Sequence, residues 1–165
     1  MKAIDAYINE KLVLNKDNVK DYVFNCHPKH LIELRELIEN LLEERGKDAD
    51  LNDIDVSKIT KLSPFPENGA WVGLFEGLDP HNIDISKWDV SNCKGFGAMF
   101  YKCENFKCDL SNWDMSNAKY INSMFMDCLN FKGEGLNKWN LKPNVEMNQT
   151  FRNCDENIIP NWYKK

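Results

Sequence analysis

The chain has 165 residues, of which 42% are hydrophobic, and its formal net charge is −5. Five tryptophans and nine phenylalanines are enough large apolar side chains for a globular core, which excludes a disordered chain, and the length suits one domain or one capped repeat array. The acidic balance excludes direct binding of nucleic acid, because affinity for a phosphate backbone depends on clustered Lys and Arg.

The beginning of the chain lacks the apolar core of a signal peptide, and no apolar run approaches the roughly 20 residues that span a bilayer. We therefore expect a cytoplasmic protein that has no membrane partner. In that reducing compartment the six cysteines are expected to be thiols.

The clearest helical pattern covers residues 27–46. Its leucines recur at helical spacing, Glu and Arg fill the other face, Pro28 suits the first turn, and Gly46 is placed to end the helix. Because only one face is apolar, we expect the helix to cover the repeats that follow. The patterns ahead of it indicate a short amphipathic helix and a strand, over residues 4–12 and 19–24.

Most of the remaining chain consists of a repeat of about 25 residues. Residues 83–107 and 108–132 are identical at more than half of their positions. Each unit opens with a short phrase in which three apolar residues recur at fixed spacing; the four phrases read DLNDIDVS, DISKWDVS, DLSNWDMS and GLNKWNLK. Three positions beyond the last apolar residue of each phrase come Ile59, Cys93, Ala118 and Asn144, and this spacing is that of leucine-rich repeats.

The second half of each unit carries a phenylalanine and, in the later units, a cysteine. Four phenylalanines share one register and are expected to stack on one another: Phe75, Phe100, Phe125 and Phe151. The first unit holds nine extra residues ahead of its phenylalanine, around residues 63–71.

Two groups of cysteine and histidine residues are the candidate metal ligands. Cys103, Cys128 and Cys154 lie one repeat apart, but Leu78 takes the fourth place and no C-x-x-C pair exists, so we interpret them as small buried side chains. The group Cys26, His27 and His30 has no fourth ligand nearby. The sequence therefore predicts no metal site and no cofactor.

These patterns together predict an α/β leucine-rich-repeat solenoid with a short parallel β-sheet on one face. We expect an N-terminal helical cap region in residues 1–49, a solenoid of about four units in residues 50–157, and a C-terminal cap in residues 158–165. The caps are needed because the end units have no neighbour to cover their apolar edges.

The phrase D-[IL]-S-x-W-D-[VM]-S-N followed by M-F-x-x-C-x-x-F resembles the BspA-like leucine-rich repeats, in the variant found in mycoplasma surface lipoproteins and in gut-bacterial and phage proteins. The resemblance covers residues 50–154. It implies a right-handed solenoid used for adhesion or protein binding, and it carries no catalytic residues. Short members without an export signal resemble phage or mobile-element products.

The resulting functional hypothesis is a non-catalytic, monomeric protein-binding module in the bacterial cytoplasm, whose partner is a host protein. The biological role that we infer is a phage or mobile-element antagonist of a host defence system, of the anti-CRISPR kind. The alternative is a bacterial surface or adhesin-type leucine-rich-repeat protein, and a remote alternative is a metal or redox protein. Catalysis is not expected, since the Ser-Asp pairs recur with the repeat and there are only three histidines.

The partner is expected on the outward positions of the repeated phrases. One row comprises Lys87, Asn112 and Lys138, and the next comprises Asp55, Asp89, Asp114 and Asn140. The competing site is the insertion, whose Phe65 and Trp71 are candidate aromatic anchors. The simpler alternative is that the rows are a solvated surface and the insertion packs on the cap.

Overall fold

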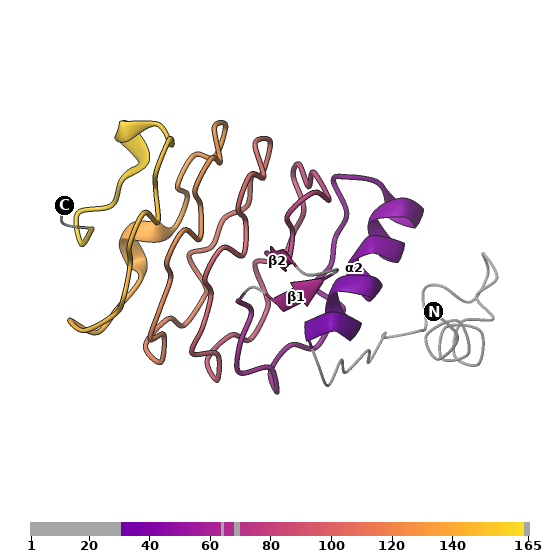
Figure 1. The fold of residues 1–165 in the computed structure, drawn as a ribbon, viewed down its shortest axis with the longest axis horizontal. Coiled ribbons are helices and arrows are strands. Elements are labelled where there is room, and N and C mark those ends of the chain that lie inside the picture. Colours follow the sequence, from indigo (N-terminus) through magenta and orange to yellow (C-terminus); the bar gives the residue numbers. More distant parts are fainter. Residues whose placement is uncertain (1–30, 64, 68–69, 164–165) are drawn as a thin grey trace.

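The computed structural model describes residues 31–63, 65–67 and 70–163. Its elements are α2 (Leu31–Arg45), β1 (Phe65–Glu67), β2 (Ala70–Val72) and two short 3₁₀ helices, η1 (Leu136–Lys138) and η2 (Glu156–Ile158). Figure 1 shows α2 at one end of a row of chain turns that lie side by side, with the C-terminus at the other end. The predicted helix over 4–12, the strand over 19–24 and the Cys26–His30 group lie outside the described residues.

The predicted helix is confirmed as α2, and it ends where the sequence indicates. Gly46 has φ of 86°, and its N–H donates to the carbonyl of Leu42 over 3.0 Å, which closes the last turn. The leucine-rich face is buried, with Leu34 and Ile38 fully inaccessible. The helix thus packs its apolar face into the common core.

The prediction of an α/β leucine-rich-repeat solenoid with a parallel sheet is wrong. Among the described residues there is one α-helix, and the paired strands are those of one antiparallel hairpin, in which β1 and β2 match Phe65 with Val72. Successive units meet through isolated parallel bridges instead, such as Gly95 with Tyr120 and Tyr120 with Glu146. The hairpin occupies the predicted insertion in the first unit.

Local turns explain why the repeated phrases are not strands. In the second unit the N–H of Trp88 donates to the carbonyl of Ile85, and the N–H of Cys93 donates to that of Val90, both across three residues. The side chain of Asp84 also accepts the N–H of Ser86 at 3.0 Å. Such Asp-x-Ser turns compete with extended backbone. The apolar spacing therefore arises from successive turns rather than from strand alternation.

The core consists of aromatic columns that run through the units. The predicted phenylalanine column is confirmed: ring centroids are 5.2 Å apart for Phe75 and Phe100, 5.5 Å for Phe100 and Phe125, and 5.6 Å for Phe125 and Phe151. A second column of tryptophans satisfies backbone groups as well, since each indole N–H donates to a carbonyl of the preceding unit. These tryptophans are Trp88, Trp113, Trp139 and Trp162.

The repeated cysteines also donate to backbone carbonyls of the preceding unit. The thiols of Cys103, Cys128 and Cys154 lie 3.3, 2.9 and 2.9 Å from the carbonyl oxygens of Phe75, Phe100 and Phe125. Cys103 and Cys128 are fully buried, as predicted, whereas Cys154 is half-buried. Burial raises the pKa of Cys154 to about 11 and that of Cys128 further, which keeps the proton available for donation. Within the described segments, no group of three metal-ligating side chains is present.

Several units hold a non-glycine residue in the left-handed region two positions before the stacked phenylalanine. Ala98, Ser123 and Gln149 have φ of 50°, 55° and 58°. This conformation brings Cβ close to the following carbonyl and costs roughly 1–2 kcal/mol for a residue other than glycine. The cost is a consequence of stacking, because the N–H of Ala98 donates to Asn122 of the next unit in this geometry.

We expect Ala98→Gly to raise the free energy of unfolding by up to about 1 kcal/mol, since glycine relieves this strain at a smaller entropic cost. Ala118→Gly is the matched control: Ala118 is buried and is absent from the left-handed region, so the same change should destabilise the protein. Urea denaturation of both variants measures the difference. A loss of stability in Ala98→Gly would contradict the strain argument.

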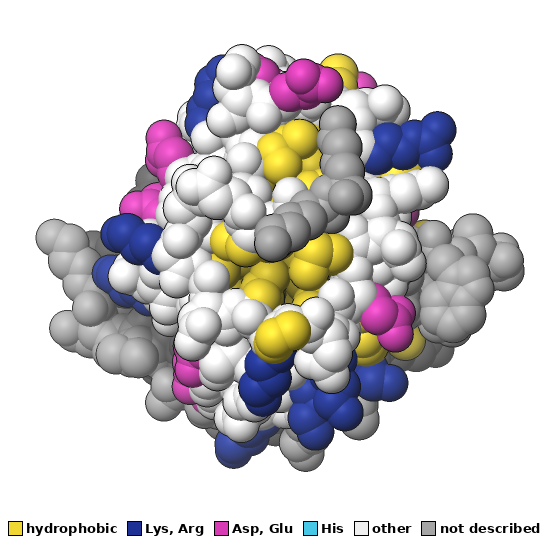
Figure 2. Space-filling model, turned by 90° about the vertical axis from the view of Figure 1, so that its left-hand side faces the viewer, with side chains coloured by type: hydrophobic (Ala, Val, Ile, Leu, Met, Phe, Trp, Pro, Cys, Tyr) yellow, Lys and Arg dark blue, Asp and Glu magenta, His cyan; other side chains and the backbone are white. Residues whose placement is uncertain are grey.

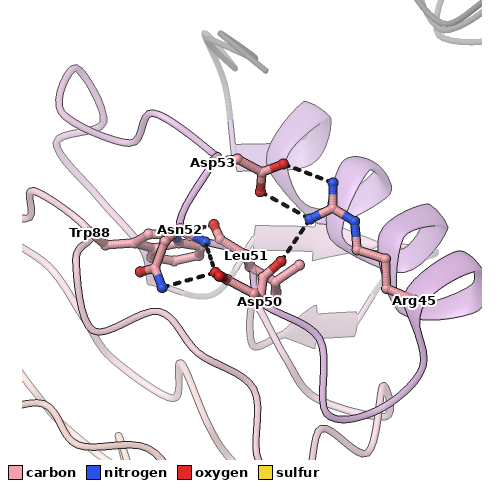
Figure 3. Close-up of polar contacts among 6 residues, drawn as sticks. All are labelled: Arg45, Asp50, Leu51, Asn52, Asp53 and Trp88. Carbon is pink, nitrogen blue, oxygen red and sulfur yellow. Dashed lines mark hydrogen bonds and ion pairs between the residues drawn. The ribbon is translucent and has the colours of Figure 1, made fainter. Parts of the chain in front are cut away.

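The junction between α2 and the first unit contains two arginines with different environments. In Figure 3 the exposed Arg45 pairs with both carboxylate oxygens of Asp53, at 3.0 and 2.7 Å, and with the carbonyl of Asp50 at 2.7 Å. Arg35, in contrast, is buried: its Nη1 donates to the carbonyls of Gly73 and Leu74 at 2.9 Å, and its Nη2 to that of Glu76 at 3.0 Å.

Arg35 replaces a missing neighbour. In the third unit, the carbonyls that correspond to Leu74 and Glu76 accept N–H groups of the preceding unit, from Phe100 and Lys102. Among the described residues no unit precedes the first, and a guanidinium from α2 supplies the donors instead. The division into an N-terminal cap, repeats and a C-terminal cap stays a prediction, because residues 1–30 of the proposed cap are outside the described part.

Candidate functional site

The two predicted rows lie on the surface of the stacked units. Lys87, Asn112 and Lys138 of the first row are exposed, and in the second row Asp55 is half-buried while the other members, Asp89, Asp114 and Asn140, are exposed. The residues that alternate with them along each phrase, such as Trp88 and Val90, are buried in the core, as the sequence indicates. We call the seven residues of the two rows the polar face.

Neighbouring units are connected directly along this face. The backbone N–H of Lys87 donates to the side-chain oxygen of Asn52 at 2.8 Å. The side-chain amides of Asn92 and Asn117 donate to the carbonyls of Ser57 and Ser91, at 3.0 and 2.9 Å. These contacts hold successive phrases in register, so the structure brings the row residues of adjacent units side by side.

The carboxylates of the polar face are held by their own turns. Oδ1 of Asp89 accepts the N–H of Ser91 at 3.1 Å and its hydroxyl at 2.6 Å, and Oδ1 of Asp114 accepts the N–H of Ser116 at 3.0 Å. Hydrogen bonds from Ser116 lower the pKa of Asp114 below its ordinary value. The lowered pKa keeps Asp114 charged at neutral pH, and the turn hydrogen bonds orient both carboxylates before any partner arrives.

One comparison identifies the family. A family model described as "Mycoplasma protein of unknown function, DUF285" matches residues 35–162, well over half of the chain. This chain is a member of the DUF285 family. Comparisons with curated proteins and with solved structures found no match. The description agrees with the mycoplasma side of the resemblance seen in the motifs, and it states no function.

The limits of the DUF285 match coincide with structural features. The match starts at Arg35, which supplies the donors for the first unit, and ends at Trp162, the last member of the tryptophan column. The family unit therefore includes most of α2 together with the repeats. None of the helices in the described part is long and apolar enough to cross a membrane.

The competing site of this DUF285 protein lies in the inserted hairpin. Phe65 belongs to β1 and Trp71 to β2, and the register pairs Phe65 with Val72 and Pro66 with Trp71. The structure places the insertion in a short antiparallel hairpin. The role of Phe65 and Trp71 as aromatic anchors stays a prediction.

Sequence reasoning missed the asparagines and Arg35. The S-N pairs at the ends of the phrases, which contain Asn92 and Asn117, do recur in the sequence, and that recurrence was the available signal. Arg35 had no such signal, because it occurs once, in a helix where Glu and Arg were expected to face water.

Proposed function

We propose that this DUF285 protein is a non-catalytic protein-binding module whose partner binds the polar face. The observation that supports this most is the repeated presentation of exposed charged and amide side chains by adjacent units, in rows kept in register by contacts between units. A partner that contacts several units at once gains from many polar interactions on one rigid surface.

Preorganisation adds to this argument. The turn hydrogen bonds of Asp89 and Asp114 fix these side chains in the free protein, which reduces the entropy that a partner must overcome when it binds. The same contacts argue against catalysis, since the Ser-Asp pairs serve turns and repeat from unit to unit. The finer resemblance of the motifs, to BspA-like repeats, also supports protein binding.

For the biological role we propose a cytoplasmic antagonist of a host defence system, encoded by a phage or mobile element, with a host protein as partner. This rests on the resemblance of short members to phage products. The membership in a mycoplasma family favours a second candidate, a surface or adhesin-type protein, because the motifs also resemble mycoplasma surface lipoproteins. Fractionation of cells that make the native full-length product separates the two: recovery at the cell surface would exclude the cytoplasmic role.

The polar face is tested by the double variant Asp89→Asn with Asp114→Asn. An amide keeps the acceptor for the serine N–H groups, so the melting temperature should stay the same, while loss of two charges should weaken capture of a stoichiometric partner from host lysate by about tenfold, equivalent to ~1.4 kcal/mol. Asp48→Asn is the matched control, since Asp48 is an exposed residue outside the polar face whose Oδ1 accepts the N–H of Asn82.

Two outcomes would overturn the proposal. If wild-type protein captures no stoichiometric partner from host lysates, the binding function itself fails. If capture survives the double variant but is abolished by Phe65→Ala with Trp71→Ala, the inserted hairpin is the binding site instead.

A further inference from the structure

The units are joined by a regular row of backbone hydrogen bonds. In the second unit the N–H groups of alternate residues donate to carbonyls of the third: these donors are Phe96, Ala98, Phe100 and Lys102. The third unit repeats the pattern toward the fourth, with Ile121, Ser123, Phe125 and Asp127 as donors. The second and third units thus each offer four N–H groups to the unit that follows.

The fourth unit has the same donors, and no further unit follows it among the described residues. They are the N–H groups of Met147, Gln149, Phe151 and Asn153, and within the part of the chain that the structure describes none of them has an acceptor. The residues between them point the other way, since Thr150 and Arg152 offer their carbonyls to the third unit. We call these four N–H groups the donor edge.

The donor edge borders an apolar surface. Figure 2 views this end of the molecule and shows hydrophobic side chains gathered at its centre. The partly buried hydrophobic side chains of the last unit and of the residues after it include Met147, Ile158, Ile159, Trp162 and Tyr163. A row of unpaired donors beside apolar side chains is the arrangement by which an exposed edge recruits another chain segment.

The donor edge cannot pair with a second folded copy of this chain. Two donor edges present N–H groups to each other and have no acceptors to exchange. The opposite end of a second copy is also unsuitable, because Arg35 already occupies the carbonyls of Gly73, Leu74 and Glu76. The occupant must therefore be a segment whose backbone carbonyls are free.

We infer that the donor edge binds a polypeptide segment of another protein that presents free backbone carbonyls at alternate residues, in the conformation of one further repeat unit. In that conformation two positions are left-handed, as Ser123 and Asp127 are in the third unit with φ of 55° and 63°. Glycine, asparagine or aspartate at these positions therefore favours binding.

Tyr163 sets a side-chain requirement. Its ring meets Phe151 edge-on, with centroids 5.0 Å apart and 84° between the ring planes, whereas the phenylalanines inside the stack lie face to face at 5.2 to 5.6 Å. Tyr163 thus takes the place of the next ring in the column. A segment with a small residue at the phenylalanine position fits without displacing it.

The test uses a synthetic peptide that copies residues 119–129, with Phe125→Ala, Ser123→Gly and Asp127→Gly. Amide hydrogen exchange followed by NMR should show the four N–H groups of the donor edge slowed by about tenfold or more at saturating peptide, with the already paired N–H groups of the third unit unchanged. A peptide of the same composition in scrambled order is the control.

A variant of the protein tests the side-chain requirement. Tyr163→Ala should bind the peptide that retains Phe125 more tightly than the alanine peptide, which reverses the preference of the wild type. Absence of protection at millimolar peptide would overturn the inference. Protection of the same N–H groups by raising the protein concentration without peptide would also overturn it, in favour of a second copy.

This inference does not depend on the proposed function. The double variant Asp89→Asn with Asp114→Asn leaves the donor edge intact, so its peptide binding should equal that of the wild type. If the peptide binds but no host partner is captured, only the proposed function fails. If a host partner is captured but the peptide does not bind, only this inference fails.

Discussion

Replacing Phe125 with alanine should lower the free energy of unfolding by about 3–5 kcal/mol, the range for large aromatic side chains in cores. Phe125 is inaccessible to solvent and touches rings on both sides, at 5.5 Å from Phe100, 5.6 Å from Phe151 and 4.6 Å from Phe131. Removing it opens a cavity in the middle of the column, where units on both sides are held by backbone hydrogen bonds and cannot collapse freely.

Trp113→Ala is expected to cost a similar amount, because the variant loses a buried ring and leaves the carbonyl of Ile85 without its indole donor. Leu129→Ala is the control in the same unit, since Leu129 is 51% exposed and should matter by less than about 1 kcal/mol. Urea denaturation gives the differences. A cost below about 1 kcal/mol for Phe125→Ala or Trp113→Ala would show that the column is packed differently.

Arg35→Met is the second substitution with a large expected effect, roughly 3–5 kcal/mol. Methionine preserves part of the apolar stem, but three carbonyls of the first unit lose the guanidinium donors, two of them in buried hydrogen bonds. Glu39, which lies 2.9 Å from Nε of Arg35, also loses its ionic partner. The variant should melt at a much lower temperature, with the first unit and α2 exchanging amide protons earliest.

Arg45→Met is the matched control for this variant. Arg45 also joins α2 to the first unit, through Asp53 and the carbonyl of Asp50, but its contacts are exposed to solvent. Exposed ion pairs contribute about 0–1 kcal/mol. If the two variants lose equal free energy of unfolding, the hydrogen bonds from Arg35 to the carbonyls of the first unit contribute no more than an exposed surface contact.

The repeat itself was predictable from the sequence, and so was much of the core. Because like units stack, residues at equivalent positions of successive units fall into columns, and the period alone places Phe75, Phe100 and Phe125 over one another. The same reasoning correctly predicted α2, its end at Gly46, the burial of Cys103 and the outward direction of Asp89 and its counterparts. In the last unit the spacing places Asn144 in line with Cys93 and Ala118, whereas the buried residue is Val145, after a turn that contains Pro143.

The backbone conformation of the units was not predictable in this way. Apolar residues spaced by three and two positions suit a strand of a leucine-rich repeat and a succession of turns equally well, and the Asp-x-Ser hydrogen bonds that decide for turns depend on side-chain geometry. The expected parallel sheet is accordingly replaced by isolated bridges.

The sequence by itself determined the period, the register and the buried columns, because these follow from which side chains are apolar and how far apart they lie. Only the tertiary structure decided how the two ends are completed. A backbone carbonyl or N–H is the same in every residue, so its need for a partner becomes visible only when the neighbouring unit is in place or missing. That is why Arg35 emerges as the donor for the first unit, and why the N–H groups of Met147, Gln149, Phe151 and Asn153 at the other end have no acceptor among the described residues.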